Sequence, residues 1–360
     1  MASIPAWTWI APALASGLLT LKFASIIPAD NALVQVLAGI LLGAAVFAAV
    51  HHAEVLALKL GEPFGSILLA VAVTVIEVGL IISIMVAGAQ GSESVARDTI
   101  FSAVMIVLNG VVGLCLVLGG QRHFEQTFQL QGASSALAVL GTLATLALIL
   151  PNYTMTTVGP YYSAVQLIFV GTLSLALWCI FVFVQTVKHR DYFLDAPGEE
   201  PDVAHEKPSD KVALLSLALL LVSLAAVVLL AKVLSIPLDQ GIAAVGLPQA
   251  FVGVVIAAIV LLPESLAAAK SALLNRLQNS INLSLGSAIA SIGLTIPTVA
   301  IVSLMLDQKL VLGMTPSGVM LLALTLFVST LTLGTGRTSV LQGAVHLVIF
   351  AAFLLISAVP

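Results

Sequence analysis

The chain has 360 residues, of which 60% are hydrophobic and only 8% are charged, and its net charge is −4. Soluble domains carry about 25% charged residues, so this composition excludes a single soluble core and favours a bundle of helices embedded in lipid. The acidic balance and the lack of a basic stripe exclude a nucleic-acid-binding surface.

Apolar stretches long enough to cross a bilayer follow one another along the whole chain. A span needs about 20 residues of helix. Eleven are predicted, at about 5–27, 31–59, 64–88, 98–119, 133–151, 160–187, 212–235, 246–270, 281–305, 315–334 and 338–359. The first stretch lacks the cationic beginning of a signal peptide, so we expect it to be retained as a helix. The sequence therefore predicts an all-α polytopic membrane protein with about eleven transmembrane helices.

Glu54 is the first acidic residue inside a predicted span. It lies near the end of 31–59, in the sequence His51-His52-Ala53-Glu54. Adjacent helical residues point about 100° apart, so the two histidines are not expected to chelate a metal together. At this shallow depth Glu54 either reaches water or relays cations or protons to deeper residues.

Glu77 lies near the centre of 64–88, among alanine, valine, threonine and isoleucine. An ionised carboxylate at such a depth costs about 2.5–3.5 kcal/mol, so an intramembrane acid is a functional candidate by default. The alternative is a protonated glutamate that hydrogen-bonds between helices for structure. Glu264 in 246–270 poses the same question, and Pro263 before it frees a backbone carbonyl one turn upstream. Free carbonyls beside a carboxylate suit a hard cation.

Small polar residues recur with helical spacing in the fourth and ninth spans. The fourth span carries Thr99, Ser102 and Asn109, and the ninth carries Ser284, Ser287, Ser291, Thr295 and Thr298. Such residues are common in helix packing within membranes. Two stripes in matched positions nevertheless favour a polar pathway.

One long polar segment, 188–211, holds seven of the seventeen acidic residues. It is either a solvated linker or a segment that gathers and senses cations. The linker divides the chain into an extra N-terminal helix (1–30), a first five-helix repeat (31–187) and a second one (212–360). The two glutamate helices are five spans apart and therefore cross the membrane in opposite directions, which predicts an inverted repeat.

Lysine and arginine are divided unequally between the two sides of the membrane. With eleven spans, nine of these thirteen residues fall on one side and four on the other. Because cytoplasmic loops carry the excess of positive charge, the N-terminus is predicted in the cytoplasm and the C-terminus outside, in a bacterial inner membrane.

Two kinds of catalytic motif are missing. The chain has neither a G-x-x-x-x-G-K-[ST] loop for ATP nor an H-E-x-x-H zinc helix. No nucleophile with an evident base is present either. The sequence therefore predicts a transporter rather than an enzyme, without a cofactor.

Four stretches of the chain form a recognisable set: 61–77, 251–264, 281–297 and the ending Gly336-Arg-Thr-Ser-Val-Leu-Gln-Gly-Ala. Together they resemble the calcium/proton antiporters of the cation/calcium exchanger superfamily. The third stretch supplies the candidate pathway residues Asn282, Gly286, Ser287 and Ser291. The likeness extends from about residue 31 to the end and is greatest to the bacterial sodium–potassium/proton and calcium/proton subgroup.

This resemblance implies alternating access between two inverted five-helix repeats, with Glu77 and Glu264 binding cation and proton by turns. The family usually carries Gly-Asn shortly before each glutamate. Here the matching residues are Val73-Thr74 and Val260-Leu261. Thr74 can replace one of the two lost amide oxygens and Leu261 cannot, which leaves room for Na⁺ or K⁺ beside Ca²⁺.

The sequence therefore predicts a secondary active antiporter that exports Ca²⁺, with Na⁺ and K⁺ as further candidate substrates, in exchange for protons. Glu77 and Glu264 are the predicted carriers and cation ligands, and Glu54 is the predicted relay. Further candidates for the pathway are Thr74, Thr99, Ser102, Asn109 and the residues of 281–297 named above. A passive cation channel is an alternative that the same polar stripes would serve, and a membrane-embedded enzyme with two acid–base glutamates is a weaker one.

Overall fold

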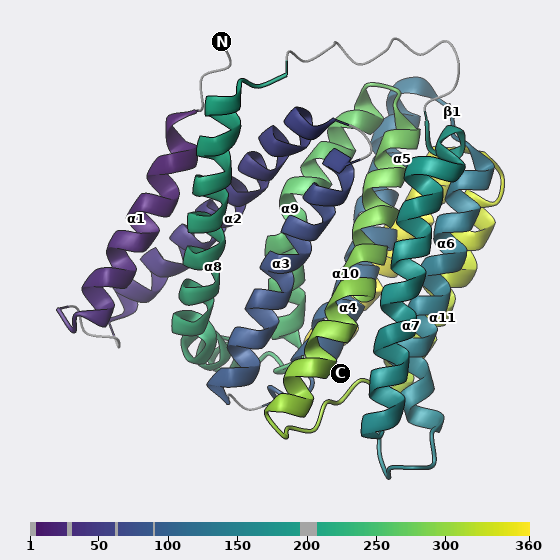
Figure 1. The fold of residues 1–360 in the computed structure, drawn as a ribbon. Coiled ribbons are helices and arrows are strands. Elements are labelled where there is room, and N and C mark those ends of the chain that lie inside the picture. Colours follow the sequence, from purple (N-terminus) through teal and green to yellow (C-terminus); the bar gives the residue numbers. More distant parts are fainter. Residues whose placement is uncertain (1–4, 27–30, 62–63, 89–90, 195–206) are drawn as a thin grey trace. The chain divides into compact units, whose positions relative to one another are not determined.

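The computed structural model describes residues 5–26, 31–61, 64–88, 91–194 and 207–360, and nearly all of them are helical (Figure 1). Ten helical stretches are long and apolar enough to cross a membrane. An eleventh predicted span is occupied by α1, which has 18 residues. The predicted class, an all-α polytopic membrane protein, is confirmed.

The described elements follow the predicted spans closely. In chain order they are α1 (Ala6–Phe23), α2 (Ala32–Leu60), α3 (Phe64–Ala87), α4 (Val95–Met105), η1 (Ile106–Val111), α5 (Val112–His123), β1 (Gln126–Thr127), α6 (Leu130–Ala144), η2 (Thr145–Ile149), η3 (Leu150–Tyr153), α7 (Ala164–Phe183), η4 (Val184–Lys188), η5 (Arg190–Phe193), α8 (Asp210–Ala244), α9 (Phe251–Leu273), α10 (Leu277–Met305), α11 (Pro316–Leu333), β2 (Arg337–Thr338) and α12 (Val340–Ala358). Three of the spans contain a π-helical turn, at η1, η2 and η4.

The seventh span is longer than predicted. The expected end near residue 235 precedes Pro237, yet α8 continues through this proline and has 35 residues. Lipid-embedded helices tolerate proline because neighbouring groups satisfy the backbone that it disturbs. Most of the acidic linker, residues 195–206, lies outside the described residues.

The chain folds into two compact units, and each unit combines a segment that precedes the linker with a segment that follows it. Unit 1 comprises residues 1–92 and 201–246, and unit 2 comprises residues 93–200 and 247–360.

Unit 1 consists of α1, α2, α3 and α8, and α8 lies alongside α2 and α3 (Figure 1). Gly79 on α3 permits the close approach of α8, because a Cβ at this position would lie 2.6 Å from Cγ2 of Val228. One turn further, the hydroxyl of Ser83 donates to the carbonyl oxygen of Val228 at 3.2 Å. The paired histidines contact α1, where Nε2 of His52 lies 3.2 Å from the carbonyl oxygen of Thr8.

Unit 2 contains the remaining helices, and its loops meet in pairs. The strand β1 after the fourth span pairs antiparallel with β2 after the tenth. At other loops Val311 pairs with Tyr161 and donates its N–H to the carbonyl oxygen of Glu93 at 3.0 Å. In each case the joined segments are separated by an even number of spans. This is what a chain that crosses the membrane alternately requires.

Two glycines bring α5 and α12 together in unit 2. A Cβ on Gly343 would lie 2.7 Å from both the carbonyl oxygen of Gly113 and the nitrogen of Val117. A Cβ on Gly113 would in turn lie 2.9 Å from Cβ of His346. The two helix backbones are therefore in direct contact, as small residues allow in membranes.

We expect Gly343→Ala to lower the free energy of unfolding by about 1–3 kcal/mol, because the added methyl group forces two packed backbones apart. The midpoint of thermal unfolding in detergent measures this loss. Gly39→Ala is the matched control, since a Cβ at Gly39 meets no atom within 4 Å. An unchanged midpoint for Gly343→Ala would show that the two helices separate without cost.

Candidate cation site

Glu264 is buried inside unit 2 and accepts a hydrogen bond from a neighbouring helix. It lies on α9 and is only 8% exposed. The hydroxyl of Ser287 on α10 donates a short hydrogen bond to its Oε2. Pro263 lies within α9, and because proline has no N–H, the carbonyl of Ile259 loses its helical partner. A carboxylate, a hydroxyl and a freed carbonyl are thus gathered along one short stretch of the bundle.

Buried hydroxyls of α4 lie beside the helix that carries Glu264. Gly253 allows α9 to approach α4, because a Cβ there would lie 2.7 Å from the nitrogen of Thr99. The side chain of Thr99 is fully buried, and its hydroxyl has no hydrogen-bond partner among the described residues. Ser102, one turn further along α4, is also buried. These oxygens are available to a cation or a water molecule.

The polar stripe of α10 continues on both sides of Ser287. Ser284 and Thr295 are buried, and their hydroxyls have no hydrogen-bond partner among the described residues. Ser291 is buried between them. A Cβ at Gly286 would meet nothing within 4 Å, so there is open space beside this residue.

Asn282 is engaged in structural hydrogen bonds at the beginning of α10. Its Nδ2 donates to the carbonyl oxygen of Phe193 at 2.5 Å, and its Oδ1 accepts from Nε2 of Gln278 at 2.8 Å. Gln278 also accepts from the backbone N–H of Gln129 at 2.6 Å. In this structure Asn282 therefore ties the end of η5 to α10.

Asn109 has surroundings that its spacing did not reveal. It lies in the π turn η1, and its Nδ2 donates to Oγ1 of Thr325 on α11 at 2.9 Å. Its Oδ1 lies 3.0 Å from Nδ1 of His346 on α12. The other ring nitrogen of His346 lies 3.1 Å from Oγ1 of Thr332. The one signal for this cluster in the sequence is a histidine inside an apolar span.

Glu77 belongs to unit 1, where it lies on α3 and is only 4% exposed. It is about half a turn from Gly79, so its side chain leaves the helix away from α8. Thr74 precedes it by one turn, and its hydroxyl donates to the carbonyl oxygen of Ala70 at 2.8 Å. Glu54 lies on α2 and is exposed. Residues 62–63 of the resembling stretch lie outside the described residues.

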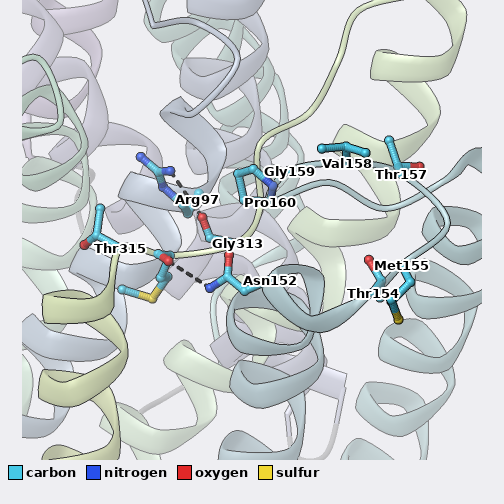
Figure 2. Close-up of a pocket in the computed structure, with 11 residues that line it drawn as sticks. Arg97, Asn152, Thr154, Met155, Thr157, Val158, Gly159, Pro160, Gly313 and Thr315 are labelled. Carbon is cyan, nitrogen blue, oxygen red and sulfur yellow. Dashed lines mark hydrogen bonds between the residues drawn. The ribbon is translucent and has the colours of Figure 1, made fainter.

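A separate pocket of about 570 Å³ opens between loops of unit 2 (Figure 2). Arg97 donates to the carbonyl oxygen of Gly313 at 3.3 Å and forms a 2.7 Å ion pair with Asp98. Asn152 donates to the carbonyl oxygen of Met314 at 2.8 Å. These contacts join the loops to the beginning of α4. None of the predicted carriers lines this pocket.

Tyr162 secures the same loop region. Its hydroxyl donates to the carbonyl oxygen of Leu146 at 2.6 Å, and burial raises its pKa to about 12.

In the part of the chain that the structure describes, no three His, Cys, Asp or Glu side chains come together. A cation at Glu264 would therefore take its remaining oxygens from hydroxyls, carbonyls and water, as hard cations accept.

A bundle of membrane-spanning helices that buries a hydrogen-bonded carboxylate, beside hydroxyls without a partner among the described residues, is typical of an ion-transport protein. The family model described as sodium/calcium exchanger protein matches residues 31–187 and 215–359, so the chain belongs to this family. Its members are ion exchangers and not enzymes, and the resemblance seen in the sequence is confirmed.

Relatives are found by sequence and by structure. The chain is 56% identical to protein y4hA of Sinorhizobium fredii (strain NBRC 101917 / NGR234) over 360 residues, which is 100% of this chain and 98% of the relative. It is 35% identical to the sodium-potassium/proton antiporter ChaA of Escherichia coli (strain K12) over 86% of this chain and 84% of the relative. The structure of native YfkE matches with a TM-score of 0.75 at 16% identity, covering 98% of this chain and 100% of that one. The structure of the H⁺/Ca²⁺ exchanger CAX matches with a TM-score of 0.70 at 16% identity, covering 98% and 89%. At these identities the two structures establish a common fold.

We expect Ser287→Ala to weaken cation binding about tenfold or more, because hydrogen bonds to charged groups contribute about 1.5–3 kcal/mol. Calorimetric titration of the purified protein with Ca²⁺ and with Na⁺ measures the change. Thr172→Val is the control, since the exposed Thr172 bonds only to its own helix at Ile168. Equal affinities in parent and Ser287→Ala would separate the hydroxyl from the cation site.

We also expect the phenol of Tyr162 to ionise near pH 12. The folded protein holds this proton more tightly than the unfolded chain, so the stabilisation is complete below about pH 10 and is lost as the pH rises through about 12. The ultraviolet absorbance of tyrosinate measures the titration, with Tyr162→Phe as the blank. A difference signal near pH 10 would contradict the burial of this group.

Proposed function

We propose that this protein is a secondary active antiporter that exports a cation from the cytoplasm in exchange for protons. The observation that carries the proposal is the buried carboxylate of Glu264, which accepts a hydrogen bond from Ser287 within a membrane-spanning unit. The names of two relatives support it, since ChaA is a sodium-potassium/proton antiporter and the protein of Aphanothece halophytica is a Ca²⁺/H⁺ antiporter.

In this proposal, cation and proton transport are coupled because either ion must neutralise the two glutamates. Glu77 and Glu264 carry about −2 when both are ionised, and the low dielectric of the bilayer opposes the movement of such a charge. One divalent cation or two protons neutralise the pair. Only neutralised forms change their accessibility readily, so cation and proton move in opposite directions.

The residues that precede the two glutamates, Thr74 and Leu261, offer few oxygens to a cation, which argues against strict selectivity for Ca²⁺. Ca²⁺ takes six to eight oxygens in proteins. Thr74 directs its hydroxyl proton to Ala70, and Leu261 has no side-chain oxygen. The carbonyl of Leu261 is also occupied, since it accepts from the hydroxyl of Ser265 at 2.7 Å. We therefore include Na⁺ and K⁺ with Ca²⁺ as substrates.

The remaining parts of the proposal concern route and orientation. Glu54 relays ions on the cytoplasmic side, and the hydroxyls of Thr99, Ser102 and Ser291 line the path. The excess of lysine and arginine on one side supports a cytoplasmic N-terminus and an external C-terminus in the inner membrane. The inverted repeats 31–187 and 212–360 exchange roles as access alternates.

A passive cation channel is the competing function. Buried hydroxyls of α4 and α10 would serve a conducting path equally well. A channel conducts without opposing proton movement, and this separates the two functions experimentally.

We expect both Glu77→Gln and Glu264→Gln to reduce exchange about 100-fold, since each removes an ionisable oxygen that cation and proton share. Proteoliposomes loaded with a pH dye measure proton movement after external addition of Ca²⁺, Na⁺ or K⁺. Glu125→Gln serves as the control, because Glu125 is an exposed loop residue 3.8 Å from Arg337.

Proton release that follows cation addition and disappears in both variants supports antiport, and the initial rates rank the three cations. Cation entry without proton movement in the parent protein would instead establish the channel.

A further inference from the structure

A chain of buried hydrogen bonds joins three spans of unit 2. It runs from Thr332 through His346 and Asn109 to Thr325, over distances of 3.1, 3.0 and 2.9 Å. All four side chains are at most 3% exposed. Ser329 lies on the same face of α11, between the two threonines. None of these side chains is a predicted carrier, and Asn109 is the one among them that the sequence predicts to line the pathway.

The partners of His346 determine its hydrogen-bonding state. Asn109 donates through Nδ2 to Thr325, so its Oδ1 faces the imidazole and accepts. Nδ1 of His346 must then carry the hydrogen, and Nε2 accepts from the hydroxyl of Thr332. Both ring nitrogens are satisfied in the neutral tautomer.

No counter-ion for an imidazolium is built into this region. In the described residues, α11 and η1 hold no titratable side chain, and α12 holds only His346. The titratable side chains of the adjoining α5 are Cys115, Arg122 and His123, and those of α4 are Arg97 and Asp98. The helix α9, which packs against η1 and α5, holds Glu264 and Lys270, and Glu264 accepts a hydrogen bond from Ser287 rather than from His346. Arg97 and Asp98 pair with each other at the far end of the span. A buried charge without a partner is costly, so His346 acts as a neutral hydrogen-bonding group.

The π turn that contains Asn109 changes the direction of its own span. In a continuous α-helix, Ser102 and Asn109 would share a face, because they are seven residues apart. The π turn of residues 106–111 adds a residue to the turn and rotates the two halves relative to each other. In this arrangement the backbone of Thr99 lies against Gly253 of α9, and Asn109 bonds to α11 and α12, while η1 and α5 also pack against α9.

The second half of this span is fixed by α12. A Cβ at Gly110 would lie 3.3 Å from the ring of Phe350, and one at Gly113 would lie 2.9 Å from Cβ of His346. These close contacts prevent α5 from rotating about its axis beside α12. The extra residue in the π turn therefore determines which face of α4 points toward α9.

We propose that Asn109 and His346 are positioning residues, which hold the π turn and thereby keep the face of α4 that carries Thr99 packed against the Glu264 helix. The inference rests on the proposed function, since it assumes that this face of α4 contributes to cation binding. If the π turn relaxed to a regular helix, this face would rotate by about 100° relative to α5.

Three substitutions of His346 separate its two bonds. His346→Asn places an amide nitrogen near the site of Nδ1 and can still donate to Asn109. His346→Gln places its amide near Nε2 and keeps only the bond to Thr332. His346→Leu loses both. We expect about tenfold weaker binding of Ca²⁺ or Na⁺ in the leucine and glutamine variants, and near-parental binding in the asparagine variant.

Calorimetry of the purified full-length protein with CaCl₂ or NaCl measures binding without any need for proton exchange. A failure of antiport in liposomes therefore leaves this test intact. The pH dependence of binding is measured for the same variants, and it should be the same in parent and His346→Asn. Parental affinity in all three variants would overturn the proposal. A shifted pH dependence in His346→Asn would also overturn it, because His346 would then be a proton site.

Folding is followed by thermal unfolding, and Thr332→Val provides a milder variant that removes only the bond to Nε2. We expect it to unfold near the parental midpoint and to bind cations with near-parental affinity, since the bond to Asn109 is intact. Tenfold weaker binding in Thr332→Val would contradict the role assigned to Asn109.

Discussion

The constraint on which the structure depends is the cost of a carboxylate inside a lipid-embedded bundle. The hydroxyl of Ser287 offsets part of this cost by donating a hydrogen bond to Glu264. Pro263, in the same helix as Glu264, leaves a backbone carbonyl without its helical partner. A hydroxyl and a carbonyl beside a carboxylate are ligands that a hard cation accepts. The apolar surroundings that make the site costly also strengthen every electrostatic contact formed in it.

Close packing around this site depends on residues without side chains. Gly253 brings α9 against α4, and Gly343 brings α12 against α5. In lipid there is no hydrophobic gain from joining two helices, so van der Waals contact and buried hydrogen bonds must hold them. The span from Val95 to His123 makes both contacts, since α4 and α5 pack against α9 and α5 also packs against α12.

Much of the fold was predictable because lipid imposes a simple rule on sequence. Each of the eleven predicted apolar stretches contains helix in the described residues, and the buried acids stood out against them. What periodicity missed has physical causes. Pro237 does not end α8, since a membrane helix tolerates it, and the π turn at Asn109 breaks the regular period on which the stripe of α4 was read. The bond between Ser287 and Glu264 joins residues on separate helices, and a single sequence carries no signal for the distance between them.

The division into units also governs the order in which the protein can be completed during synthesis. The helices α1, α2 and α3 emerge first, but their partner α8 follows only after the fourth, fifth and sixth spans. Those spans in turn wait for α9 to α12 before their own unit closes. Since long-range contacts form late, two partly assembled sets of helices must coexist in the bilayer. Unit 1 can therefore be completed only once α8 has been synthesised, and unit 2 only once α12 has been synthesised.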